Sequence, residues 1–150
     1  IMPDLKYGDH IFQSLFNYKS DSQWQGRLIK YKLKNNGQIG DKVWDAGEKL
    51  SLTKSSNRNI WTIGTNYPSG INNFTTSNLS YLKNELYKGT TADTDANANK
   101  LINFIRGLDT YDEDNDGSTT DERWKLADIY HSQIAIVGPP VSTSMMLSDY

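Results

Sequence analysis

The stretch WQGRLIKYKLKNNGQIGDKVWDAGEKL, residues 24–50, decides the fold of the first half of the chain. Residues 28–33 are rich in aliphatic and aromatic side chains, which is typical of a β-strand. Asn36 and Gly37 form a strong signal for a tight turn, and the extended pattern resumes from Ile39 to Trp44. The stretch therefore predicts a β-hairpin, followed by one helical turn in DAGEKL that Asp45 caps.

Further strands are expected on both sides of this hairpin. HIFQSLFNY, residues 10–18, loosely alternates apolar and polar residues, with Ile11, Leu15 and Phe16 as candidates for burial. RNIWTIGT, residues 58–65, is a short β-branched and aromatic run that predicts another strand. Residues 1–70 are therefore predicted to form a β-rich hairpin segment.

Residues 71–108 are predicted to be a helical segment. SNLSYLKNELYKG places Leu79, Leu82 and Leu86 at helical spacing, with Ser77 as the N-cap and Gly89 as the stop.

A second helix is predicted in TDANANKLINFIRGLD, capped by Thr94 or Asp95 and ended by Gly107. The apolar stripe of this helix is expected to contain Ala98, Leu101, Ile102 and Ile105.

The last predicted element is a strand in KLADIYHSQIAIVGPP, which ends at the Pro-Pro pair and lies within residues 124–140. Its apolar residues are Ile134, Ile136 and Val137. The predicted fold class is therefore mainly β with two short α-helices.

Composition limits the class of protein. A chain of 150 residues fits one domain or a piece of a larger one, and its start at Ile1 suggests a processed or excised piece. The net charge of −2 provides no electrostatic surface for nucleic acid or an anionic membrane. No apolar run approaches the ~20 residues that a membrane-spanning helix needs. The absence of cysteine excludes disulfides, thiolate metal sites and a cysteine nucleophile.

The most unusual stretch is YDEDNDGSTTDERW, residues 111–124, whose crowded carboxylates repel one another. Calcium takes six to eight oxygen ligands, and EF-hand-type loops supply carboxylates from alternate residues. Asp112, Asp114 and Asp116 have this spacing. Gly117 follows where such a loop turns sharply, and the next residue, Ser118, would offer its backbone carbonyl. The pattern predicts a calcium-type loop at residues 109–123.

The residue that closes this loop is left open by the sequence. Arg123 occupies the position that normally carries a bidentate glutamate, so Asp121, Glu122, Thr120 or a water would complete the site. An ordinary solvated acidic loop is the alternative interpretation. Magnesium fits less well because it retains its waters, and zinc fits less well because the loop offers it no soft ligands. The candidate Ca²⁺ ligands are Asp112, Asp114, Asp116, Ser118, Asp121 and Glu122.

No pattern in the chain predicts catalysis. Phosphate-binding and dinucleotide-binding glycine motifs are absent, and no pair of carboxylates stands out as a glycosidase pair. The four tryptophans could line a sugar-binding platform, although packing within strands is the preferred interpretation. We therefore expect no catalytic residues and no enzyme.

The order of these segments resembles the PilY family of type IV pilus assembly and tip-adhesin proteins. WQGRLIKYKL, GQIGDKVWDAGEKL, RNIWTIG, LINFIRG and WKLADIYHSQIAIVGPP follow one another over roughly residues 10–140. They correspond to W-x-G-x-L, W-[DE]-A, R-x-I-[FW]-T, L-[IV]-[ND]-[FY]-[IL]-R-G and [LR]-[GA]-D-[IF]-x-[HN]-S-x-x-x-x-V-G-P-P in that family. Each pattern is weak, but together they are specific.

The resemblance implies a large secreted bacterial protein with a calcium-binding C-terminal β-propeller related to quinoprotein propellers. This chain would form the part that leads into the propeller, with 124–140 as its opening strand, because so short a chain cannot close a propeller. The implied location is the pilus tip, outside the cell. The implied partners are other segments of the parent protein, minor pilins or pilus subunits, and a host or abiotic surface.

The implied role is non-enzymatic support of pilus assembly and calcium-dependent surface adhesion. Two alternatives remain open. One is a calcium-stabilised carbohydrate-binding or adhesin module unrelated to pili. The other is a fragment of an enzyme built on the related quinoprotein propeller, which would need a redox cofactor.

Overall fold

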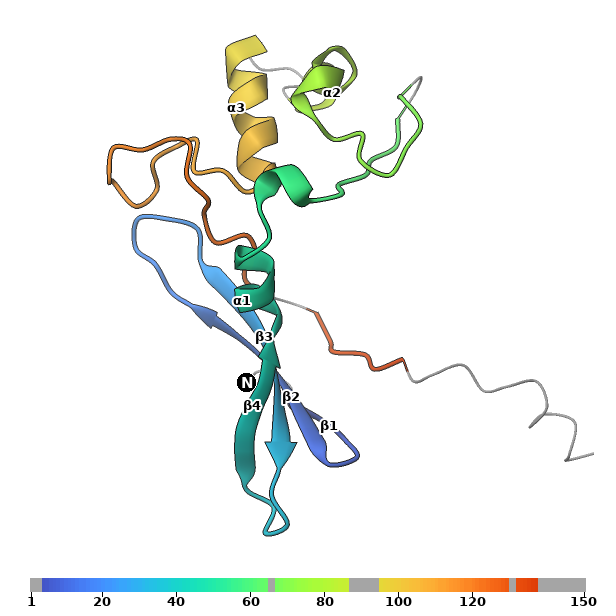
Figure 1. Ribbon diagram of the computed structural model, residues 1–150, viewed down its shortest axis with the longest axis vertical. Helices are drawn as coiled ribbons and strands as arrows, with labels where there is room; N and C mark the ends of the chain where they lie inside the picture. Colours follow the sequence, from blue (N-terminus) through green and yellow to red (C-terminus); the bar gives the residue numbers. More distant parts are fainter. Residues whose placement is uncertain (1–3, 65–66, 87–94, 130–131, 138–150) are drawn as a thin grey trace, which may run out of the picture.

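The computed structural model describes residues 4–64, 67–86, 95–129 and 132–137. Figure 1 shows a twisted sheet in the first part of the chain and helices α2 and α3 at the opposite end, with the short helix α1 between them. No described helix is long and apolar enough to cross a membrane.

The sheet is an antiparallel meander of four strands in the order β1-β2-β3-β4. Its strands are β1 (Asp4–Tyr7), β2 (His10–Asn17), β3 (Gln25–Leu33) and β4 (Ile39–Asp45). The predicted strand at residues 10–18 and the predicted hairpin are therefore confirmed. Sequential pairing through short turns needs only local contacts, which explains why sequence patterns find it.

The turn of the β3–β4 hairpin is built around Gly37, whose φ of +81° favours glycine. The amide of Gly37 donates to the carbonyl of Lys34, and the amide of Lys34 donates to the carbonyl of Gln38. These bonds position Leu33 opposite Ile39 at the start of the ladder.

Helix α1 (Ala46–Ser51) follows β4 directly, and Asp45 caps it as predicted. One carboxylate oxygen of Asp45 accepts the amides of Gly47 and Glu48, while the other accepts Arg27 Nε at 2.6 Å. Asp45 is only 1% exposed, so the charge of its carboxylate needs these partners. The cap therefore joins the end of the sheet to the helix. A 3₁₀ turn at Ser55–Asn57 follows.

The prediction of a strand at residues 58–65 is wrong for residues 58–64, which form no strand. Residue 65 lies outside the described residues. The backbone hydrogen-bonding groups of this segment are satisfied mainly by a side chain of a neighbouring segment. Buried Asn73 accepts the amide of Thr62 and donates to its carbonyl, both at 2.8 Å. A backbone bond from Phe74 to Ile60 completes the pairing. A β-rich composition could not reveal that an asparagine amide replaces the ladder.

The helical segment contains a 3₁₀ turn (Thr76–Asn78), α2 (Leu79–Leu86) and α3 (Asp95–Arg106). The predicted N-cap at Ser77 is wrong, because this residue lies inside the 3₁₀ turn that precedes α2. Asp95 is the first residue of α3, whereas the predicted cap Thr94 and the predicted stop Gly89 lie outside the described residues.

The core of this part is formed by Phe74, Leu82 and Ile102, against which partly buried apolar side chains pack. Ala98 and Ile102 of α3 are fully buried, as the predicted stripe requires, while Ile105 is 37% exposed. Helix α3 ends at Gly107, as predicted, where φ is +119°. The helices therefore bury one face of α3 against α2.

The strand predicted within residues 124–140 is absent from residues 124–129 and 132–137, and the other residues of that range lie outside the described part. Residues 124–127 instead cross the start of β3. Gly26 donates its amide to Leu126 O at 2.7 Å and accepts Trp124 Nε1 at 3.1 Å. A Cβ on Gly26 would lie 1.7 Å from Ala127 O, so only glycine permits this crossing.

These elements form a mixed α/β structure, with a four-stranded antiparallel sheet and three short helices, rather than a mainly β fold. The two missing strands account for the difference. At residues 58–64, hydrogen bonds from the Asn73 side chain replace the predicted β-ladder. At residues 124–129, the chain crosses β3 at Gly26 instead of forming a strand.

Arg106, at the end of α3, connects this helix to two other segments, residues 55–58 and 72–74. Its guanidinium donates to Asn72 Oδ1 and to the carbonyls of Ser55, Arg58 and Phe74, at 2.9–3.0 Å. The residue is 8% exposed, and burial lowers its pKa. The fixed fork of an arginine suits this role, because it directs several donors in one plane.

We expect Arg106→Met to lower the free energy of unfolding by about 3 kcal/mol or more, because it leaves several acceptors without a donor. Urea unfolding followed by circular dichroism measures this change. Lys100→Met, at an exposed position of the same helix, is the control and is expected to change stability by no more than about 0.5 kcal/mol. Equal midpoints for the two variants would contradict this role of Arg106.

Candidate metal site

The acidic loop, defined as residues 109–123, leaves the end of α3 and returns to it. Its ends pair in an isolated antiparallel bridge between Leu108 and Glu122. The amide of Asp109 donates to Asp121 O, and the amide of Arg123 donates to Gly107 O, both at 2.9 Å. The loop is therefore closed at its base by backbone hydrogen bonds.

Two arginines bind the C-terminus of α3, from which the loop leaves: Arg123 at the base of the loop, and Arg58 from the segment before α2. Arg123 donates to Phe104 O through two nitrogens and lies 3.7 Å from the centre of the Phe104 ring. Arg58 donates to the carbonyls of Ile105 and Arg106, at 2.9 and 2.8 Å. Cations at this end of a helix satisfy its free carbonyls and its dipole. The start of the loop is thus held in place from two sides.

Within the loop the chain bends back on itself. Asp112, Asn115 and Gly117 have φ values of +52°, +58° and +85°. Asp112 Oδ1 accepts the amide of Gly117, and Asp116 Oδ1 accepts the amide of Ser118 at 2.7 Å. The predicted sharp turn at Gly117 is present. Asparagine and aspartate tolerate this left-handed backbone better than most residues, which suits the composition of the loop.

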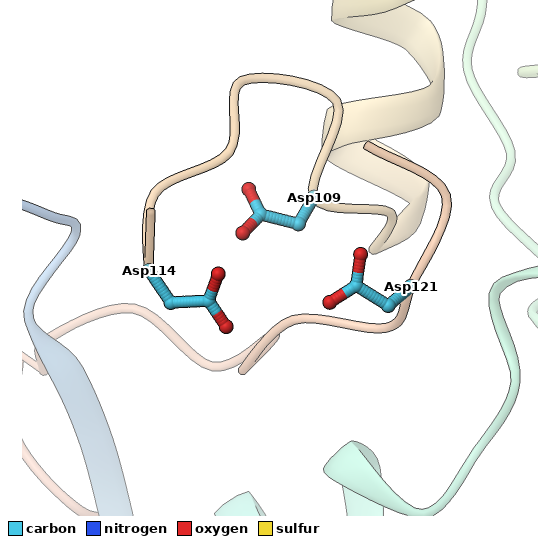
Figure 2. Close-up of side chains that lie close together, drawn as sticks. All are labelled: Asp109, Asp114 and Asp121. Atoms are coloured by element: carbon cyan, nitrogen blue, oxygen red, sulfur yellow. The ribbon is translucent and has the colours of Figure 1, made fainter. Parts of the chain in front are cut away.

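The bends bring carboxylates together in two groups that share Asp114. In the first group, Asp109, Asp114 and Asp121 each place an oxygen within 4.8 Å of the others. Figure 2 shows these three carboxylates directed toward a common space. Asp112, Asp114 and Asp116 form the second group by the same criterion. Two oxygens on opposite sides of one calcium ion lie about 5 Å apart, so either group has suitable dimensions.

The first group includes carboxylates that water does not fully hydrate. Asp109 is 3% exposed, and both of its oxygens accept the amide of Glu113 at about 3 Å. Asp121 Oδ1 is inaccessible and has no hydrogen-bond partner among the described residues. A buried carboxylate oxygen without a partner is costly, and a cation would remove this cost. An all-carboxylate donor set of this kind fits a hard cation such as Ca²⁺.

The candidate ligands are thus distributed unevenly. Asp112, Asp114 and Asp116 lie together, whereas Asp121 lies with Asp114 in the first group. The amide of Ser118 bonds to Asp116, and its hydroxyl accepts the amide of Thr120 at 3.5 Å.

Glu122 lies outside both groups, because its oxygens accept the amide of Ser55 and the ammonium of Lys125, each at 2.8 Å. Burial raises the pKa of Glu122, but these two partners outweigh burial and the pKa is lowered. Glu122 is therefore engaged in holding the base of the loop.

Asp109 belongs to the first group, yet the sequence pattern missed it. The D-x-D-x-D-G pattern starts at Asp112, three residues later. The available signal was the helix stop at Gly107, which places Asp109 at the mouth of the loop.

Crowding within the loop changes the acidity of Asp114. Loss of hydration and the carboxylate of Asp116 raise its pKa, and Asp121 and Asp109 add to the effect. Because the folded-state pKa lies above the unfolded value, the cation-free chain loses stability as the pH rises through that pKa. A bound cation would reverse this repulsion.

We therefore expect Asp114→Asn to raise the melting temperature in chelator at neutral pH and to lower it in calcium. The substitution removes repulsion in the first case and a cation ligand in the second. Thermal unfolding in EDTA and in CaCl₂ measures both signs. Asp41→Asn, at an exposed position of β4, is the control and is expected to show no such reversal. A shift of the same sign in both buffers would contradict the site.

Comparison with known proteins identifies one relative. The chain is 30% identical over 129 residues to the type IV pilus biogenesis factor PilY1 of Pseudomonas aeruginosa (strain UCBPP-PA14). The match covers 82% of this chain but only 11% of that protein. No family model and no solved structure matches. The similarity confirms the family that the motifs indicate, and we conclude that this chain is a PilY-like segment.

Proposed function

We propose that this chain belongs to a non-enzymatic component of a bacterial type IV pilus tip that supports pilus assembly and calcium-dependent surface adhesion. The observation that carries the proposal is the similarity to PilY1, a type IV pilus biogenesis factor. The protein would lie outside the cell and contact minor pilins or pilus subunits, other segments of its parent chain, and a host or abiotic surface. The same similarity favours this function over an unrelated carbohydrate-binding module or a quinoprotein enzyme.

The proposed role of calcium is to hold the acidic loop closed. An ion among Asp109, Asp114 and Asp121 would link the end of α3 to the chain that returns toward β3. Calcium sites of extracellular modules bind with dissociation constants of about 10⁻⁴–10⁻³ M, so such a site fills outside cells and empties inside them. The loop would therefore be fully ordered only at the cell surface.

The proposed relation to a β-propeller concerns the end of the chain. Residues 132–137 extend away from the rest of the described structure (Figure 1), and Val137 is 94% exposed. An extended apolar segment of this kind is suited to pair with strands of a larger domain. This supports, in a longer protein, an opening propeller strand within residues 124–140.

We expect Asp114→Ala combined with Asp116→Ala to abolish the rise in melting temperature that calcium produces in the unchanged chain. The double substitution removes the shared carboxylate and one of its neighbours. Differential scanning calorimetry with CaCl₂ and with EDTA measures the difference. Identical melting curves for the unchanged chain in the two buffers would remove the calcium part of the proposal.

The pilus function is tested in the bacterium that encodes this chain. The double variant, introduced into the full-length gene, is expected to reduce surface pili and attachment, which are measured by electron microscopy and by adhesion to glass. Asp41→Asn is the matched control, and immunoblotting of the secreted protein verifies equal amounts. Normal piliation after deletion of the whole gene would contradict a role in type IV pili.

A further inference from the structure

The connection between β2 and β3, residues 18–24, lies beside the acidic loop (Figure 1). Gln23 makes two hydrogen bonds that join them. The backbone amide of Gln23 donates to Glu113 Oε1 at 3.3 Å. The side-chain oxygen of Gln23 accepts a hydrogen bond from Arg123 Nη1 at 2.5 Å. Residues about 90–100 positions apart in sequence are thereby brought into contact.

A cavity of about 370 Å³ separates the rest of the two segments. One wall comes from the connection and the start of β3, and the other from the acidic loop and the residues after it. The residues of the candidate metal site that face it are Asp109 and Asp114. The candidate ion site and the connection therefore line one common cavity.

The bonds of Gln23 depend on residues that also shape the ion site. Asp109 holds the amide of Glu113 with both carboxylate oxygens, which positions the Glu113 side chain toward Gln23. Arg123, the second partner of Gln23, holds the base of the loop on α3. A chain of hydrogen bonds thus runs from an ion-facing carboxylate to the β2–β3 connection.

The connection carries an exposed aromatic cluster. Phe16 stacks on Trp24 with ring centres 5.0 Å apart, and Tyr18 lies edge-on to Trp24 at 5.3 Å. Tyr18 is 66% exposed and Trp24 is 39% exposed. Whatever fixes the connection also fixes the surface that these rings present.

We propose that cation binding in the acidic loop orders the 18–24 connection through Gln23, so that the aromatic cluster adopts one fixed arrangement only when the cation is bound. The inference rests on the proposed calcium site and adds its regulatory output. Repulsion among the carboxylates opposes the closed loop, and a cation that relieves it stabilises every contact that needs the closed form. Linkage is reciprocal, so the contacts of Gln23 must also strengthen cation binding.

Hydrogen–deuterium exchange of the intact chain, followed by mass spectrometry, tests the first half of this coupling. Amide exchange in peptides that cover residues 18–24 is expected to slow several-fold when CaCl₂ replaces EDTA. Isothermal titration with CaCl₂ is run on the same sample. Binding without a change in exchange overturns the inference and leaves the proposed site intact, whereas absence of binding removes both.

Gln23→Ala tests the reciprocal half, because it removes the bond to Arg123 without touching either carboxylate group. We expect it to weaken calcium binding about five-fold or more and to abolish the calcium-dependent protection of 18–24. Gln25→Ala is the matched control, since Gln25 lines the same cavity but belongs to β3, where it pairs with Asn17. Unchanged affinity in Gln23→Ala, or equal weakening in both variants, overturns the coupling.

Discussion

Backbone pairing at the base of the acidic loop is the constraint on which the candidate site depends. Leu108 and Glu122 form the bridge, and flanking amides close it on both sides. Because the ends are fixed, the carboxylates are held close together, and loss of hydration together with their repulsion raises the pKa of Asp114. A cation that relieves this repulsion would stabilise the loop in its closed form.

The segments that carry the family motifs hold one another in place. The amide of Gly26 in W-x-G-x-L donates to the carbonyl of Leu126, the first residue of the last motif. Arg58, the first residue of R-x-I-[FW]-T, binds the C-terminus of the helix that contains L-[IV]-[ND]-[FY]-[IL]-R-G. Arg106 of that helix motif in turn binds the carbonyls of Ser55 and Arg58. Four of the five weak patterns therefore take part in these bonds between motif segments.

Sequence reasoning succeeded where structure follows from neighbours along the chain. The Asn36-Gly37 turn, the Asp45 cap and the helix stop at Gly107 each depend on a few adjacent residues. It failed where a distant group replaced the expected partner. The side-chain amide of Asn73 takes the place of a strand beside Thr62. Residues 124–127, expected to begin a strand, instead cross β3 at Gly26.

The candidate site divides in the same way. Alternate spacing revealed the group at Asp112, Asp114 and Asp116, because the spacing itself encodes which side chains share a face of the bend. Asp109 and Asp121 meet only because the two ends of the loop pair, and the sequence contains no local record of that pairing.

Because its base is closed, the loop begins and ends at the same place in the structure. A change in the length of such a loop has little effect on the free energy of folding, since doubling the length of a flexible loop adds only about 0.6 kcal/mol of closure entropy. Insertions or deletions between Tyr111 and Thr120 would leave the Leu108–Glu122 bridge, the bonds of Arg58 and Arg123 to α3, and the sheet in place. The loop is thus a position at which evolution, or a protein engineer, can exchange this acidic segment for another while retaining the scaffold.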